Sequence, residues 1–187
     1  MITSVGQEMA SRPTRIGIPA GALVVLIGAA ASGKSTFAAR QFDGDWIVAS
    51  DRLRVELTGA TPDDVVFAEL HRRVQAALVA GRTVVVDATN TDWMRRAELI
   101  SRAHNHGRPA IAIAFDLPLE LCLARNATRR RTVVAGVIRR QHGALRRDLD
   151  RLDVEGFRSV HVLRTVHEVE QAAVQIEKGP VARAISS

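Results

Sequence analysis

The chain has 187 residues, of which 47% are apolar and 25% are charged, a composition typical of a globular domain with a full hydrophobic core. This composition excludes a disordered chain, a collagen-like repeat and a disulfide-rich miniprotein, and the single cysteine, Cys122, excludes an intrachain disulfide and a cysteine zinc site. The net charge of +6 is carried almost wholly by arginine, and the expected location is a reducing cytoplasm.

The two ends of the chain are expected to lie outside the folded unit. We predict a loosely ordered extension over residues 1–20, a single domain over 21–178 and a C-terminal tail over 179–187. An uncharged run over 16–33 is interrupted by glycines and a proline, so it does not predict a membrane helix. Glu8 argues against a signal peptide, and we expect no association with a membrane.

Short aliphatic runs alternate with segments of helical periodicity along the rest of the chain. Strands are predicted at 22–28, 46–49, 83–87, 110–115 and 160–163, and helices at 34–41, 51–58, 62–80, 92–103, from 118 onward, at 132–151 and at 166–177. Runs without polar alternation are typical of strands that are covered on both faces. The pattern therefore predicts an α/β fold, with a parallel sheet of about five strands between two layers of helices.

The segment Gly28-Ala-Ala-Ala-Ser-Gly33-Lys34-Ser35 has the P-loop pattern between a predicted strand and a predicted helix. Its backbone N–H groups and the helix N-terminus attract phosphate, Lys34 adds a charge for the γ-phosphate, and Ser35 is a ligand for Mg²⁺. This motif predicts the three-layer P-loop NTPase fold and the binding of ATP or another NTP with Mg²⁺. The predicted nucleotide-binding residues are Gly28, Ala31, Ser32, Gly33, Lys34, Ser35 and Thr36, together with Arg125 from a later segment.

Two acidic residues follow predicted strands and are candidates for the chemistry. Asp51 lies where a carboxylate could accept the proton of an attacking hydroxyl, and Arg54, one helical turn later, could hold a phosphate of the acceptor. The alternative is that Asp51 only caps a helix. Asp87 ends the third predicted strand and could hold a water of the Mg²⁺ shell, or it could simply begin a turn.

Arginines are concentrated between residues 125 and 151, where nine of them face only two acids. Arg125 and Arg129 are four residues apart, so we expect them to project from one helix as part of a lid that neutralises transferring phosphate. The helix predicted at 132–151 has a basic face, which suits a polyanion such as nucleic acid or equally a solvated surface. Trp93 could stack on an acceptor base or pack in the core.

These motifs resemble the kinase domain of the polynucleotide 5′-hydroxyl kinases, in particular the bacterial polynucleotide kinase-phosphatase type, over residues 22–170. The resemblance is carried by 22–28 with 33–38, by Ser50-Asp51-x-x-Arg54, by 85–90, by Arg125-Asn-x-x-Arg129, by 137–139 and by 155–160.

This resemblance implies that Lys34 and Ser35 bind ATP·Mg²⁺, that Asp51 is the general base and that Arg54 contacts the acceptor nucleotide. It also implies a lid made by Arg125, Arg129 and Arg131. The spacing near residues 130–133 is about one residue shorter than in the family, so Arg130 is an alternative to Arg131.

The favoured hypothesis is a kinase that transfers the NTP γ-phosphate to the 5′-OH end of single-stranded or end-exposed RNA or DNA, in cooperation with a separate phosphatase and ligase. The alternative is a P-loop kinase of a small hydroxyl acceptor such as a nucleoside, a sugar or an antibiotic. A nucleotide-dependent binding module without turnover is a third possibility.

Overall fold

The computed structural model describes residues 14–58 and 61–177 and has a parallel five-stranded sheet in the order β3-β4-β2-β5-β6. The strands are β2 (Leu23–Gly28), β3 (Ile47–Ala49), β4 (Val84–Asp87), β5 (Ala110–Phe115) and β6 (Ser159–Leu163). The helices are α1 (Lys34–Gln41), α2 (Ser50–Glu56), α3 (Asp63–Val79), α4 (Trp93–Asn105), α5 (Leu119–Ala127), α6 (Ala135–Asp148) and α7 (Val166–Gln171), with 3-10 turns η1 (Gly44–Trp46) and η2 (Leu149–Val154). The α/β class and the parallel sheet of five strands predicted from the sequence are confirmed.

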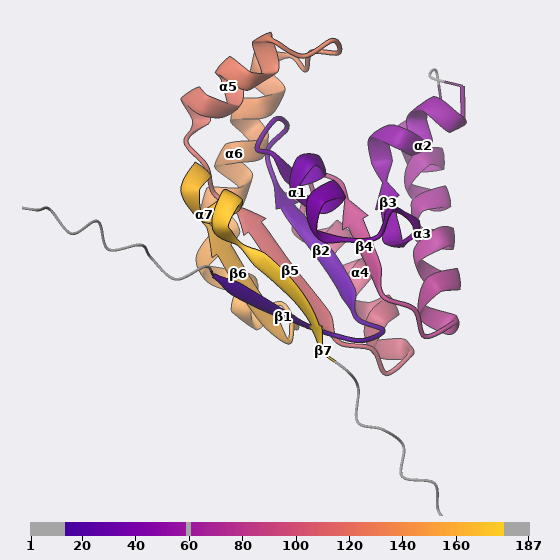
Figure 1. The fold of residues 1–187 in the computed structure, drawn as a ribbon. Helices are drawn as coiled ribbons and strands as arrows, with labels where there is room; N and C mark the ends of the chain where they lie inside the picture. The colour runs from indigo at the N-terminus through magenta and orange to yellow at the C-terminus, as the bar shows by residue number, and fades with distance from the viewer. Residues whose placement is uncertain (1–13, 59–60, 178–187) are drawn as a thin grey trace, which may run out of the picture.

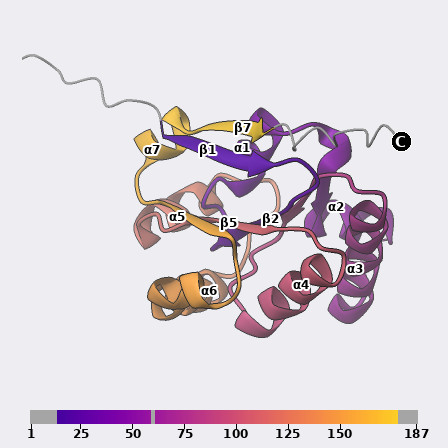
Figure 2. The ribbon, with the colours of Figure 1, turned by 90° about the horizontal axis from the view of Figure 1, so that it is seen from below.

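The central strand β2 is buried on both faces, which explains its unbroken apolar sequence. Its alternate side chains enter two separate cores, with Val25 packed among residues of α3, α4 and α6 and Leu26 packed with Phe37 of α1. Figure 2 shows α3, α4 and α6 under one face of the sheet and α1, α7 and a small second sheet over the other. No helix within the described residues is long and apolar enough to cross a membrane.

The second sheet corrects two expectations. Residues 15–19, expected within a loose extension, form strand β1 (Arg15–Pro19), and residues 173–177, expected to end a helix, form strand β7 (Ala173–Glu177). The two strands pair in parallel, and β1 places two fully buried isoleucines, Ile16 and Ile18, against the core. The rest of the predicted extension, residues 1–13, and the predicted tail at 179–187 lie outside the described residues.

All five strands of the main sheet end at the same edge, and this edge carries the loop that joins β2 to α1. Figure 1 shows α5 and α6 on one side of that loop and α2 and α3 on the other. The helix predicted at 132–151 is divided into α6 and η2, and α5 ends at Ala127, earlier than expected. The carboxyl edge of the sheet is where α/β proteins of this kind bind ligands.

Candidate active site

The P-loop connects Gly28, the last residue of β2, to Lys34, the first residue of α1. Gly33 has a φ of 98° and Ala31 a φ of 62°, so both lie in the left-handed region. Glycine tolerates this conformation, whereas alanine incurs roughly 1–2 kcal/mol of strain. The loop therefore has the curled backbone that a phosphate cradle needs, with the N-terminus of α1 directed toward it.

Lys34 is the buried cation of this loop. Its Nζ donates hydrogen bonds to the carbonyl oxygens of Gly28 at 2.9 Å and Ala29 at 2.7 Å, and to Ser32 Oγ at 3.3 Å. Burial lowers the pKa of Lys34 to about 8. Charges from other elements also shift this pKa: those of Asp87, Cys122 and Asp51 raise it, and that of Arg129 lowers it.

Ser35 and Asp87 are the residues beside the P-loop that could hold a magnesium ion. Burial raises the pKa of the Asp87 carboxyl, and a hydrogen bond from Ser35 and the charge of Lys34 act in the opposite direction. Among the described residues no group of three or more His, Cys, Asp and Glu side chains is arranged to hold a metal. A magnesium ion typically takes one or two protein oxygens and completes its shell with phosphates and water, which fits this pair of residues beside the P-loop.

Asp51 lies in the first turn of α2, directly after β3, with 70% of its side chain exposed. Arg54 Nη1 is 3.2 Å from Asp51 Oδ1, and Arg54 Nη2 is 2.9 Å from Asp63 Oδ1 at the start of α3. Arg54 is therefore held between two carboxylates. Within the part of the chain that the structure describes, the Asp51 side chain accepts no hydrogen bond from a backbone N–H at the start of α2. The alternative role of Asp51 as a helix cap is therefore not observed.

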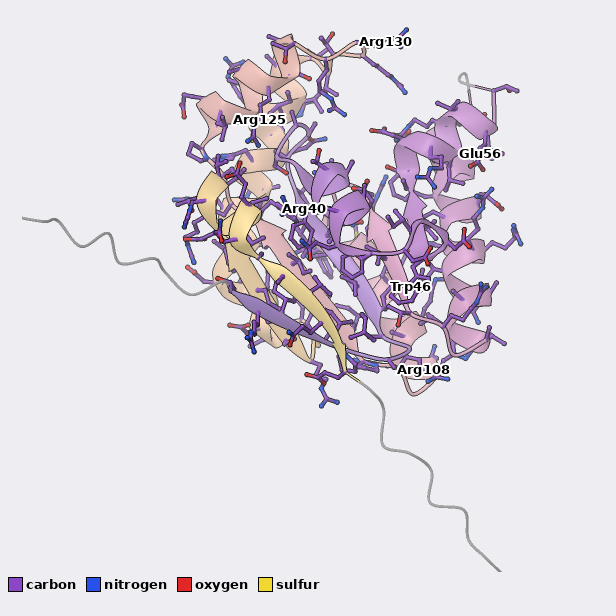
Figure 3. All side chains as sticks on the ribbon, in the orientation of Figure 1. Arg40, Trp46, Glu56, Arg108, Arg125 and Arg130 are labelled. Carbon is purple, nitrogen blue, oxygen red and sulfur yellow. The ribbon has the colours of Figure 1, made fainter. Side chains whose placement is uncertain are left out.

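Two of the predicted lid arginines, Arg125 and Arg130, lie on the opposite side of the P-loop from Glu56 of α2 (Figure 3). Arg125 is in the last turn of α5, and its Nη1 would lie 3.5 Å from a Cβ placed on Gly33, so the guanidinium rests against the P-loop. Arg129 lies beyond the end of α5, and the expectation that it shares a helix with Arg125 is wrong. The positive charge of Arg129 still lowers the pKa of Lys34. Arg130 and Arg131 are exposed in the same turn.

Thr36 and Ser32 complete the predicted nucleotide-binding residues. Ser32 is buried in the loop, and Thr36 is exposed in the first turn of α1. The structure thus gathers Lys34, Ser35, Asp51, Asp87 and the arginines Arg125 and Arg129 around one edge of the sheet.

Several residues at this edge could not be identified from the sequence. Asn90 has a φ of 47°, and its Nδ2 donates to the carbonyl of Leu26 at 2.7 Å, which ties the loop after β4 to β2. The side chain of Gln141 on α6 accepts a hydrogen bond of 2.9 Å from the backbone N–H of Ala30. The positive charge of Arg52 lowers the pKa of Asp87. Each has a partner distant in sequence. Asn90 and Arg52 lie inside segments that carry the family resemblance, but nothing in those segments indicates which residues they contact.

Asn126 closes the lid loop, which we define as residues 128–134 between α5 and α6. Its Nδ2 donates to the carbonyl of Val133 at 2.8 Å, and its Oδ1 accepts from the N–H of Val133 at 2.9 Å. Asn126 is buried. This pair of bonds joins the two ends of the loop, so that Arg129, Arg130 and Arg131 are carried on a closed turn.

Solved structures share this fold at low sequence identity. The Pnkp1/Rnl/Hen1 RNA repair complex contains a chain that is 21% identical, with a TM-score of 0.59, covering 80% of this chain and 49% of that one. A gluconokinase from Sinorhizobium meliloti 1021 is 15% identical, with a TM-score of 0.51 and a coverage of 80% and 86%. AvrRxo1-ORF1:-ORF2 with ATP is 17% identical, with a TM-score of 0.61 and a coverage of 84% and 56%.

These likenesses establish the fold, which is that of the P-loop kinases. The chain spans about half the length of its counterpart in the RNA repair complex. The comparison with curated proteins found no match. The profile of the AAA domain family AAA_33 matches residues 23–152, well over half of the chain, and the chain therefore belongs to this family.

Proposed function

We propose that the protein is an ATP-dependent polynucleotide kinase that transfers the γ-phosphate to the 5′-OH end of RNA or DNA. The observation that carries the proposal is the position of Lys34 in the P-loop, between α2, which bears the exposed Asp51, and α5, which bears Arg125 and leads into the lid loop (Figure 1). A phosphoryl group held by Lys34 would then have a base on its acceptor side and arginines on its nucleotide side.

The reaction requires one bond to form and one to break. The acceptor hydroxyl oxygen attacks the γ-phosphorus in line, the bond from that phosphorus to the β–γ bridging oxygen breaks, and ADP leaves. Asp51 takes the hydroxyl proton, while Lys34 and Arg125 neutralise the charge that develops on the phosphoryl oxygens. When bound at Ser35 and, through water, at Asp87, Mg²⁺ would supply further neutralisation of the phosphates.

Arg54 is proposed to hold the acceptor in place. Its guanidinium already bridges Asp51 and Asp63, so it is oriented beside the base before any acceptor binds. An acceptor phosphate would compete with these carboxylates for the guanidinium and would leave Asp51 free to accept a proton.

The test is transfer of radiolabel from γ-labelled ATP to matched 5′-OH RNA and DNA oligonucleotides, with Lys34→Ala as the blank. Asp51→Asn should lower kcat by about 10²- to 10⁴-fold, the usual contribution of a general base, with little change in the KM for ATP. Asp63→Asn is the matched control, because it removes the other carboxylate that holds Arg54. We expect Asp63→Asn to change kcat only a few-fold.

Two results would contradict the proposal. Equal losses in Asp51→Asn and Asp63→Asn would show that Asp51 only orients Arg54. Absence of label on both oligonucleotides, with ATP still bound, would exclude the polynucleotide acceptor and direct the search to small hydroxyl acceptors.

A further inference from the structure

A pocket of about 460 Å³ lies beside the N-terminus of α4 and is not used by the proposed reaction. It is lined by Trp93, Asp148, Arg151, Val154 and Glu155. Trp93 is 60% exposed and Val154 is 83% exposed. The alternative of core packing for Trp93 is therefore wrong, and an indole with an accessible surface borders an open pocket.

The wall of this Trp93 pocket is held rigidly by a buried arginine. Arg96 is completely buried and donates hydrogen bonds to both carboxylate oxygens of Glu155, at 2.7 and 2.5 Å, and to Asp148 Oδ2 at 2.9 Å. It also donates to the carbonyl of Asn90 at 3.0 Å. Since a buried charge needs such partners, the two carboxylates are fixed in place and compensated, and their remaining lone pairs can accept N–H groups from a ligand.

The pocket lies near the carboxyl edge of the sheet. Trp93 is six residues beyond Asp87, so their Cα atoms are at most about 22 Å apart, and Asn90 between them is anchored to β2. Figure 2 shows α4 lying between α3 and α6 under the sheet. Asp51 follows β3 and Asp87 ends β4, and these two strands are neighbours, so the acceptor side of the proposed active site and the Trp93 pocket lie at the same edge of the sheet.

The lining itself carries two carboxylates and one guanidinium, and further positive charge lies beside it, where the phosphates of a bound strand would run. Arg147 near the end of α6 and Arg151 in the pocket wall are exposed, and no ion pair is recorded for either among the residues that the structure describes. Arg139 and Arg140 of α6 are likewise exposed and have no ion pair with any residue that the structure describes. A neutral base could therefore enter the pocket while its flanking phosphates contact unpaired guanidinium groups.

We propose that the Trp93 pocket binds a nucleobase of the acceptor strand downstream of its 5′ end. The base stacks on the indole of Trp93, its exocyclic N–H groups donate to Asp148 or Glu155, and Arg151 contacts the adjacent phosphate. This site rests on the proposed function for its ligand, and it assigns to the enzyme a preference for acceptors several nucleotides long.

Binding can be measured without catalysis, by fluorescence. In a Trp46→Phe background Trp93 is the only tryptophan of the chain, so quenching reports on its surface alone. A single-stranded 5′-OH hexanucleotide should quench it strongly, an abasic oligonucleotide of the same length and charge should not, and Arg151→Gln should weaken the titration several-fold. Equal quenching by the abasic strand, or no quenching by either, would overturn the proposal.

Kinetics then give a second readout. Trp93→Ala should raise the KM for a hexanucleotide by about 5- to 150-fold, the effect expected for loss of one base–aromatic stack. It should leave the KM for ATP and for a nucleoside 3′-monophosphate acceptor unchanged, and Trp93→Phe should restore most of the loss. An equal rise in KM for the mononucleotide would overturn the pocket assignment. If the unaltered protein labels no acceptor, the proposed function fails, and the fluorescence titration still decides whether the pocket binds bases.

Discussion

The ammonium group of Lys34 is buried in the P-loop, where it is bonded to two backbone carbonyls and a hydroxyl. Desolvation disfavours its charged form, which is why its pKa is lowered to about 8. Triphosphate in the loop would place negative charge against the ammonium and raise this pKa again. At a pH where Lys34 of the free protein is neutral, binding of the nucleotide must therefore be accompanied by uptake of one proton by Lys34.

ATP affinity should therefore depend on pH with a definite sign. Below pH 8 Lys34 is charged in both states and the Kd should be nearly constant. Above pH 8 the free protein loses the proton first, so the Kd for a non-hydrolysable ATP analogue should rise by up to tenfold per pH unit. Burial raises the pKa of the neighbouring Cys122 thiol, which moves its ionisation to higher pH than that of an ordinary cysteine.

Calorimetry in buffers of different ionisation enthalpy would count the protons taken up across this window. In Lys34→Ala the affinity should be weak and its dependence on pH should be lost. The same slope in Lys34→Ala and in the unaltered protein would show that another group is responsible.

At the scale of elements, β2, β3, β4 and β5 were predictable because each is a continuous apolar run that needs no alternation. The half-buried edge strand β6 includes Ser159 and His161, and only its apolar residues indicated a strand. The P-loop was readable because its residues are contiguous. Strand β1 was not, since its five residues include Gly17 and Pro19, and its partner β7 lies at the other end of the chain. The extent of α5 was misjudged because the buried Asn126 bonds to Val133 across the loop, a contact that no local pattern predicts.

Asn126 should control how firmly the lid loop is closed. Asn126→Ala removes two hydrogen bonds, each worth about 0.5–1.5 kcal/mol, and should free a loop that contains Arg129, Arg130 and Arg131. We expect trypsin to cleave this loop roughly ten times faster in the variant, as followed by mass spectrometry of native protein. Thr128→Ala, which removes an exposed hydrogen bond of 3.0 Å to the carbonyl of Arg125, is the control and should leave the cleavage rate nearly unchanged. Equal cleavage in the two variants would mean that Asn126 does not hold the loop.

At the scale of the whole molecule, the charge is strongly polarised. Residues 125–151 carry nine arginines and two acids, although the net charge of the chain is only +6. In the structure these arginines occupy the last turn of α5, the lid loop, the exposed face of α6 and η2, and they form one side of the carboxyl edge. A small acceptor needs no such surface, whereas a nucleic acid strand releases counterions for each phosphate that the surface neutralises.

The dependence of binding on salt therefore tests the polynucleotide acceptor directly. For a single strand that contacts Z arginines, the logarithm of the binding constant should fall with the logarithm of salt concentration with a slope of about −0.7Z. Replacing Arg139 and Arg140 by Gln should make this slope less steep by about 1.4 if both contact phosphates, as measured by fluorescence anisotropy of a labelled oligonucleotide. Arg82→Gln, an exposed arginine just before β4 at the opposite edge of the sheet, should leave the slope unchanged. A slope near zero in the unaltered protein would mean that the arginine face of α6 is only solvated surface, because binding that neutralises no phosphate releases no counterion.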